Sequence, residues 1–262
     1  MYACMVGTRL WHTLYSEIRG KYLIRLYFSG LIEDHGVCRI DGGQAHHVIH
    51  VLRLAEGDAV TLFDGHGVEY PAAIQRMGRA ELTLKVSGRR EVSRESPLHV
   101  TVAQSISSGE RMDYTVQKCV ELGVSAIQPL NTQRSVVRLA AERAERRIAH
   151  WQGVAAGACE QCGRNVLPQV LPVKPLLTWL GQPQDGTRYV LAPGADTRLR
   201  ELRRPTDNIT LLVGPEGGFG DDELFAIRAA GFTALSLGPR ILRTETAAAA
   251  ALSAMQTLWG DG

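Results

Sequence analysis

Two short glycine-containing stretches near the end of the chain carry charged residues that could do chemistry. Residues 214–218 read Gly-Pro-Glu-Gly-Gly, and residues 238–246 read Gly-Pro-Arg-Ile-Leu-Arg-Thr-Glu-Thr. The carboxylates of Glu216 and Glu245 could accept a proton. The guanidinium of Arg243 keeps its proton at physiological pH, so it could stabilise negative charge or bind a phosphate. These residues therefore offer acid–base chemistry beside a permanent cation.

Both stretches follow apolar runs that have the length of buried strands. Residues 209–213 read Ile-Thr-Leu-Leu-Val, and residues 234–237 read Ala-Leu-Ser-Leu. A helical pattern follows each glycine stretch, starting at Asp221 and at Ala247. Glycine-rich loops at the carboxyl ends of successive buried strands are where an open α/β sheet builds a ligand crevice.

The glycines would let a ligand approach the backbone closely, but they do not identify the ligand. Neither stretch contains Gly-x-x-x-x-Gly-Lys-Ser/Thr or Gly-x-Gly-x-x-Gly, so both of these nucleotide-binding motifs are excluded. Asp221, Asp222 and Glu223 begin the helix after the first loop, and their negative charge disfavours a phosphate there. On the residues alone, ligand-binding loops and ordinary strand–helix turns both stay open.

Together the two stretches resemble the cofactor-binding signature of the bacterial small-subunit (16S) rRNA uracil-N3 methyltransferases, which belong to the SPOUT class. The resemblance rests on residues 213–218, Val-Gly-Pro-Glu-Gly-Gly, and on residues 237–247, Leu-Gly-Pro-Arg-Ile-Leu-Arg-Thr-Glu-Thr-Ala. It covers roughly residues 25–258. It implies a SPOUT-type α/β domain with a C-terminal trefoil knot, S-adenosylmethionine as the cofactor, 16S rRNA in the small ribosomal subunit as the substrate, and a homodimer.

The resemblance also implies roles for particular residues. The implied cofactor-binding residues are Val213, Gly214, Glu216, Gly217, Leu237, Gly238, Pro239, Leu242 and Thr244. Methylation at N3 of uracil requires the loss of a proton, so Glu245 is the candidate base. Arg243 is the candidate cation for the charge that develops on the flanking carbonyl oxygens. The alternative for Glu245 is that it only complements the dipole of the helix that follows.

A smaller domain of short strands and one helix is predicted over residues 23–90, with the helix at residues 43–54. This part resembles the PUA-like RNA-binding β-barrel of the same family, because His46-His47 and Val51-Leu52-Arg53 match its pattern. His50 stands where an arginine is usual, which puts one phosphate contact in doubt. The histidines lack the glutamate of a metalloprotease motif, so exposed or capping histidines are the favoured interpretation.

The remaining chain divides into three further segments. Residues 1–22 match nothing in the family and are treated as an extension. Residues 91–97 are polar, charged and closed by Pro97, which predicts a linker. Strands alternate with helices over residues 98–262, which predicts an α/β domain with a largely parallel sheet, and its longest helix is expected over residues 139–161.

Residues 158–164 contain a Cys-x-x-Cys pair, Cys159 and Cys162, inside a stretch that matches a family motif. No second cysteine pair or histidine pair stands at a spacing suited to zinc, so neither a metal nor a redox role is expected. By resemblance, several residues contact the RNA: Arg25, Arg53, Arg134, Glu160, Gln161 and Arg164.

Composition bounds these expectations. The 262 residues are 45% hydrophobic and 21% charged with a net charge of +2, which is typical of a globular protein but too weak a charge to indicate nucleic acid by itself. No apolar run approaches a membrane span and residues 1–22 lack a signal-peptide core, so the cytoplasm is expected. Two rival functions stay open: an RNA-binding module with an inactive α/β domain, and an α/β enzyme of nucleotide metabolism.

Overall fold

The computed structural model describes residues 24–135, 141–183 and 185–262. The chain forms two compact units that separate after Ser93. Part of the stretch expected to be a linker belongs to these units, because Glu91 ends a strand of the first unit and Arg94 begins the second. The expected extension, residues 1–22, lies outside the described residues.

The N-terminal unit is built on a six-stranded, mostly antiparallel sheet. Its strands lie in the order β1–β3–β4–β5–β2, and β6 pairs with β4. The pair of β1 and β3 is parallel. The strand bounds are β1 Ile24–Tyr27, β2 Val37–Asp41, β3 Ala59–Phe63, β4 Val68–Met77, β5 Glu81–Val86 and β6 Arg90–Glu91.

Alternation along these strands puts apolar side chains into one core. In β5, Leu82, Leu84 and Val86 are buried, while Glu81 and Lys85 are exposed. The helix predicted at residues 43–54 is an α-helix, α2 Gly42–His46, that continues as a π-helical turn, η1 His47–Val51. It packs Ala45 and Val48 into the same core.

The predicted α/β domain is confirmed. Its seven strands pair in parallel throughout, in the order β10–β8–β7–β12–β11–β13, with β9 beside β8. All five residues of β12 are buried, as expected for a strand covered on both faces. The strand bounds are β7 Val100–Ser105, β8 Ala126–Asn131, β9 Gln169–Val170, β10 Lys174–Pro175, β11 Thr187–Leu191, β12 Ile209–Val213 and β13 Thr233–Leu235.

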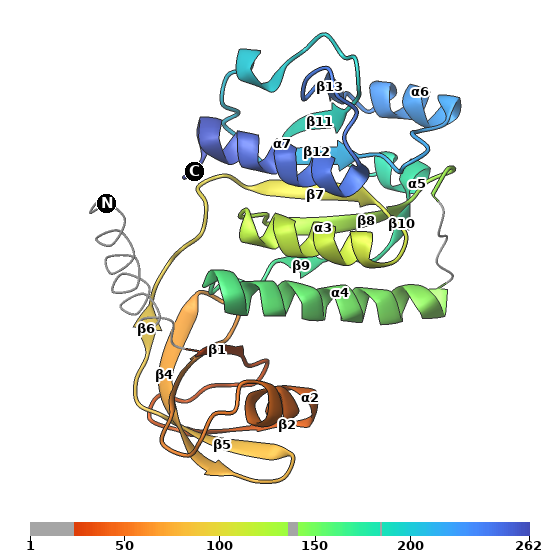
Figure 1. Cartoon of the computed structure of the whole chain (residues 1–262). Helices are drawn as coiled ribbons and strands as arrows, with labels where there is room; N and C mark the ends of the chain where they lie inside the picture. Colours follow the sequence, from red (N-terminus) through yellow and green to blue (C-terminus); the bar gives the residue numbers. More distant parts are fainter. Residues whose placement is uncertain (1–23, 136–140, 184) are drawn as a thin grey trace, which may run out of the picture. The chain divides into compact units, whose positions relative to one another are not determined.

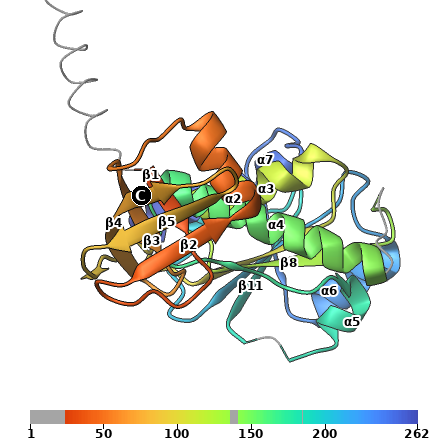
Figure 2. The same ribbon diagram turned by 90° about the horizontal axis from the view of Figure 1, so that it is seen from below.

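Helices cover both faces of this sheet (Figure 1). On one face α3 contacts both α4 and α7. On the other face α5 and α6 pack on the strands, through a core that includes Trp179, Ile227 and Leu212 (Figure 2). The helix bounds are α3 Glu110–Glu121, α4 Ala141–Cys162, α5 Leu176–Leu180, α6 Asp221–Ala229 and α7 Thr244–Trp259, with a 3-10 turn, η2, at Leu199–Glu201. No helix among the described residues has the length and apolarity needed to cross a membrane.

Some boundaries differ from the sequence-based predictions. The helix expected over residues 43–54 ends at Val51. Helix α7 begins at Thr244, three residues before the predicted Ala247, because the Thr244 hydroxyl donates to Gly214 O and holds the first turn. Residues 168–175 contain the two-residue strands β9 and β10, which are too short to show a periodic pattern. The trefoil knot stays a prediction.

Candidate functional site

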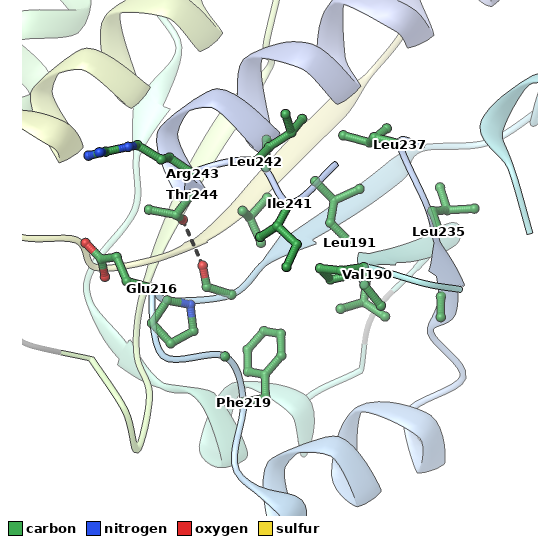
Figure 3. Close-up of a pocket in the computed structure, with 18 of the residues that line it drawn as sticks. Val190, Leu191, Glu216, Phe219, Leu235, Leu237, Ile241, Leu242, Arg243 and Thr244 are labelled. Atoms are coloured by element: carbon green, nitrogen blue, oxygen red, sulfur yellow. Dashed lines mark hydrogen bonds between the residues drawn. The ribbon is translucent and has the colours of Figure 1, made fainter. Parts of the chain in front are cut away.

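A cavity of about 590 Å³ opens at the carboxyl ends of β11, β12 and β13 (Figure 3). Both signature loops line it, together with the end of β11 and residues of α6. The sheet therefore builds its cavity where the two glycine loops meet, as the sequence predicts.

The two ends of the cavity differ in polarity. Val190, Leu235 and Leu237 lie at one end, whereas Glu216 and Arg243 lie at the other (Figure 3). Ile241, although 83% exposed, also lines the cavity. A bound molecule with one apolar and one charged end would match this arrangement.

At two positions beside the cavity a side chain would be unfavourable, for different reasons. A Cβ atom at Gly214 would lie 3.0 Å from the ring of Phe219, which is tighter than ordinary packing. Gly238 has a φ of +117°, which L side chains rarely adopt, and a Cβ there would meet no atom within 4 Å. Gly238 therefore adopts without strain a turn in which any other residue would be strained.

Thr244 joins three segments of the site through its hydroxyl. It donates to Gly214 O at 2.8 Å and accepts from Gln104 Nε2 at 2.8 Å. Gln104 lies in β7, Gly214 follows β12, and Thr244 begins α7. This chain of hydrogen bonds fixes the first glycine loop to the start of α7.

Glu216 forms an ion pair with Arg111 on α3, with 2.9 Å between Oε1 and Nη1. Arg111 lines the cavity although sequence reasoning did not select it. The one available signal was its place at the start of the helix that follows β7, since this position lies at the same edge of the sheet as the glycine loops.

Glu245 lies in the first turn of α7, and its Oε2 atom is buried without a hydrogen-bond partner among the described residues. The side-chain oxygens of Asn131, at the end of β8, and of Ser107, just after β7, are also buried without a partner in this part of the chain. Burying polar atoms without partners is costly. None of these three residues is among the described residues that line the cavity.

Arg243 is the N-cap residue of α7 and is exposed. Its side chain extends from the same end of the cavity as Glu216 and away from Leu235 and Leu237 (Figure 3). A permanent cation thus stands beside the polar end of the cavity.

The residues expected to contact RNA differ in how exposed their side chains are and in what they already bond to. Arg53, Arg134 and Gln161 are exposed, and Glu160 is half-buried. Arg134 also donates to Gly217 O at 3.3 Å, which places it on the first glycine loop. Arg25 is bonded within the N-terminal unit, where it pairs with Glu69 at 2.9 Å and its guanidinium stacks 5.0 Å from the centroid of the Phe63 ring.

Arg164 requires a revision. It is 5% exposed, and its guanidinium donates to Glu95 Oε2 and to the carbonyl oxygens of Val120 and Val124. A direct contact with RNA would require breaking these buried bonds. We therefore assign Arg164 to holding Glu95 and the end of α3 together.

The Cys-x-x-Cys pair lies in the last turn of α4. Cys159 is buried and its thiol donates to Val166 O at 3.7 Å, whereas Cys162 is half-buried. Burial raises the pKa of the Cys119 thiol to about 12, so this thiol stays protonated at neutral pH. The described residues contain no group of three or more histidine, cysteine, aspartate or glutamate side chains placed to hold a metal ion.

Comparisons with known proteins agree with this architecture. A family model described as an RNA methyltransferase domain matches residues 94–256, and one described as an RNA methyltransferase PUA domain matches residues 40–87. The ribosomal RNA small subunit methyltransferase E of Buchnera aphidicola is 31% identical, over 94% of this chain and 98% of its own. That of Bacillus subtilis is 32% identical, over 90% and 95%.

Solved structures give the same result. The ribosomal RNA small subunit methyltransferase E of Neisseria gonorrhoeae, bound to S-adenosylmethionine, is 40% identical and superposes with a TM-score of 0.83 over 91% of this chain and 99% of its own. A Legionella pneumophila protein, solved with the bound cofactor SAM, is 38% identical with a TM-score of 0.88 over 92% and 99%. The chain therefore belongs to the family of RNA methyltransferases that carry a PUA domain, a family that includes the proteins named ribosomal RNA small subunit methyltransferase E.

Proposed function

We propose that this protein transfers a methyl group from S-adenosylmethionine to N3 of a uridine in the rRNA of the small ribosomal subunit. The observation that carries the proposal is the cavity between the two glycine loops, with an apolar end at Leu235 and Leu237 and a charged end at Glu216 and Arg243. Two relatives of known structure hold S-adenosylmethionine.

The cavity suits this cofactor in size and in polarity. A volume of about 590 Å³ lies within the range of small-molecule sites. Leu237, Leu242 and Val190 supply apolar surface for an adenine ring, and the backbone at Gly214 and Gly238 supplies polar groups at close range. Bound there, S-adenosylmethionine supplies an electrophilic methyl group on a sulfonium.

Glu245 and Arg243 are the residues that we assign to the uracil that accepts the methyl group. Glu245 Oε2, buried and without a partner in the described chain, would accept the N3 proton of uracil. Arg243 would stabilise the negative charge that develops on the carbonyl oxygens beside N3. The competing role for Glu245, complementing the dipole of α7, also agrees with its place in the first turn, so only rate measurements separate the two.

The N-terminal unit is assigned to RNA binding. It matches a PUA domain of RNA methyltransferases, and Arg53 is exposed on it. Arg134, beside the first glycine loop, is the candidate phosphate contact nearest to the cavity. Because the proposed substrate is ribosomal RNA, we place the protein in the cytoplasm, and we propose that it acts as a homodimer.

The test is mass mapping of small-subunit rRNA from a strain that lacks the gene. We expect one uridine to lose 14 mass units, and the purified protein with S-adenosylmethionine to restore the mass on isolated small subunits. A reverse-transcription stop, which methylation of the pairing edge produces, locates the methyl group at N3. If the rRNA mass is unchanged in the deletion strain, the proposed function is wrong.

A further inference from the structure

The ion pair of Arg111 and Glu216 stands at the charged end of the cavity. Its partners come from different elements, since Arg111 is in the first turn of α3 and Glu216 is in the loop after β12. Their side chains are 42% and 25% exposed, and 2.9 Å separates Nη1 from Oε1. Both line the cavity, so both can be reached by a molecule bound there.

Among the described residues that line the cavity, Glu216 is the only acid. Three other arginines line it, Arg228, Arg240 and Arg243, and no ion pair between described residues includes any of them. The cavity therefore presents one carboxylate held beside one guanidinium, three further guanidinium groups, and otherwise mostly apolar side chains.

S-adenosylmethionine has the complementary pattern. Its adenosine end is uncharged, and its amino-acid end carries a carboxylate and an ammonium on one carbon atom. An exposed ion pair of the Arg111 type shifts an equilibrium by only about fivefold at most, so exchanging its partners for those of a ligand costs little. Hydrogen bonds between a protein and a charged ligand group are stronger.

We propose that Arg111 and Glu216 together bind the amino-acid end of the cofactor. The guanidinium of Arg111 binds the carboxylate of the cofactor, and the carboxylate of Glu216 binds its ammonium. This assignment rests on the proposed function, because it takes S-adenosylmethionine as the ligand. The competing explanation is that the pair only fixes the shape of the first glycine loop.

Ligands that lack parts of the amino-acid end separate the two explanations. S-adenosylhomocysteine keeps both charged groups, whereas methylthioadenosine lacks both, and the sulfur is uncharged in each. Calorimetry should show that Arg111→Ala and Glu216→Gln each weaken the binding of S-adenosylhomocysteine roughly 10- to 100-fold. Methylthioadenosine should bind both variants within about twofold of the unaltered protein, a difference that one lost hydrogen bond would exceed.

Decarboxylated S-adenosylmethionine tests each residue alone. Like S-adenosylmethionine it keeps the ammonium and the sulfonium, but it lacks the carboxylate. Arg111→Ala should lower the affinity for S-adenosylmethionine and leave the affinity for the decarboxylated ligand unchanged. Glu216→Gln should lower the affinity for both. Arg240→Ala is the matched control, because Arg240 is an exposed arginine of the same cavity, and it should weaken none of the ligands selectively.

The outcomes distinguish this assignment from the proposed function. Equal loss of S-adenosylhomocysteine and methylthioadenosine in Arg111→Ala means that the pair shapes the loop, and it overturns the assignment alone. Absence of all binding to the unaltered protein overturns the proposed function and the assignment with it. Thermal melting confirms that each variant is folded, and Arg111→Met, which keeps the apolar stem, replaces Arg111→Ala if that variant is unstable.

Discussion

Charged residues in the C-terminal unit divide by burial into two kinds. Arg164 and Glu223 are 5% and 1% exposed and have their polar atoms bonded to backbone and side-chain groups of the same unit. Arg243 and Arg134 are exposed beside the cavity. A buried charge with fixed partners supports the structure, whereas an exposed charge beside a cavity is available to a substrate.

Arg243 should matter more to the rate of methylation than to cofactor affinity. It would interact with charge that exists only as N3 loses its proton, and such an interaction lowers the barrier without strengthening ground-state binding. Arg243→Ala should lower the single-turnover rate on small subunits on the order of 100- to 1000-fold. Arg243→Lys keeps the charge but lacks the planar fork, so it should recover only part of the rate.

The control for this prediction is cofactor affinity, measured by calorimetry on the same variants. Thr246→Ala provides a change at an exposed, uncharged neighbour in α7 that is not among the described residues lining the cavity. A loss of cofactor affinity in proportion to the rate would make Arg243 a cofactor ligand and would contradict the assigned role.

At the scale of elements, the loops after β8 and β12 are joined through the first turn of α6. Glu223 accepts from Gly220 N through Oε2 at 2.9 Å and from Gln133 N through Oε1 at 2.8 Å. Arg134 in turn donates to Gly217 O. The acidic start of α6 disfavours phosphate there. One of its carboxylates, that of Glu223, positions the loop that precedes the helix.

Glu223→Gln should destabilise the C-terminal unit. The amide that replaces one carboxylate oxygen is a donor, so one of the two backbone N–H groups would be left without an acceptor. A buried unsatisfied group of this kind costs about 1–3 kcal/mol. Denaturant unfolding measures the change in the free energy of unfolding, and Asp222→Asn, an exposed residue of the same turn, is the control. Equal stability of the two variants would show that these bonds contribute nothing.

At the scale of the whole molecule, the two units have separate cores and separate family matches. The cavity is formed by residues of the C-terminal unit alone. The apolar side chains of the N-terminal unit pack into a core of their own. We therefore expect cofactor binding and RNA affinity to be separable by cutting the chain between the units.

Residues 94–262 produced alone should bind S-adenosylmethionine with the affinity of the full chain but should fail to methylate small subunits. RNA affinity of the full chain should fall steeply with salt, because phosphate contacts release counterions. Calorimetry measures the first quantity, and filter binding at several salt concentrations measures the second. Full methylation by the isolated unit would contradict this division of labour.

The proposed homodimer is also a property of the whole molecule. Helix α7 carries the half-buried Ala247, Ala249 and Ala250 and an exposed Leu258, which offer a surface for close packing. Light scattering coupled to size exclusion should give about twice the mass of one chain, 28.6 kDa. A monomer that keeps full activity at nanomolar concentration would rule the dimer out.

The sequence by itself determined the parallel sheet, the two glycine loops and the cavity at their junction. These features depend on local signals: an apolar run marks a buried strand, and a glycine marks a backbone conformation or a close approach. The same locality explains the misplaced start of α7, since this start depends on a bond from Thr244 to Gly214, thirty positions away in the chain.

Only the tertiary structure decided which distant groups the charged residues bond to. Arg111 with Glu216 spans 105 positions, Glu223 with Gln133 spans 90, and Arg164 with Glu95 spans 69. A single sequence carries no periodic signal at such separations. Whether an arginine faces substrate or stabilises a loop depends on what the fold packs around it, because burial without partners is too costly to persist.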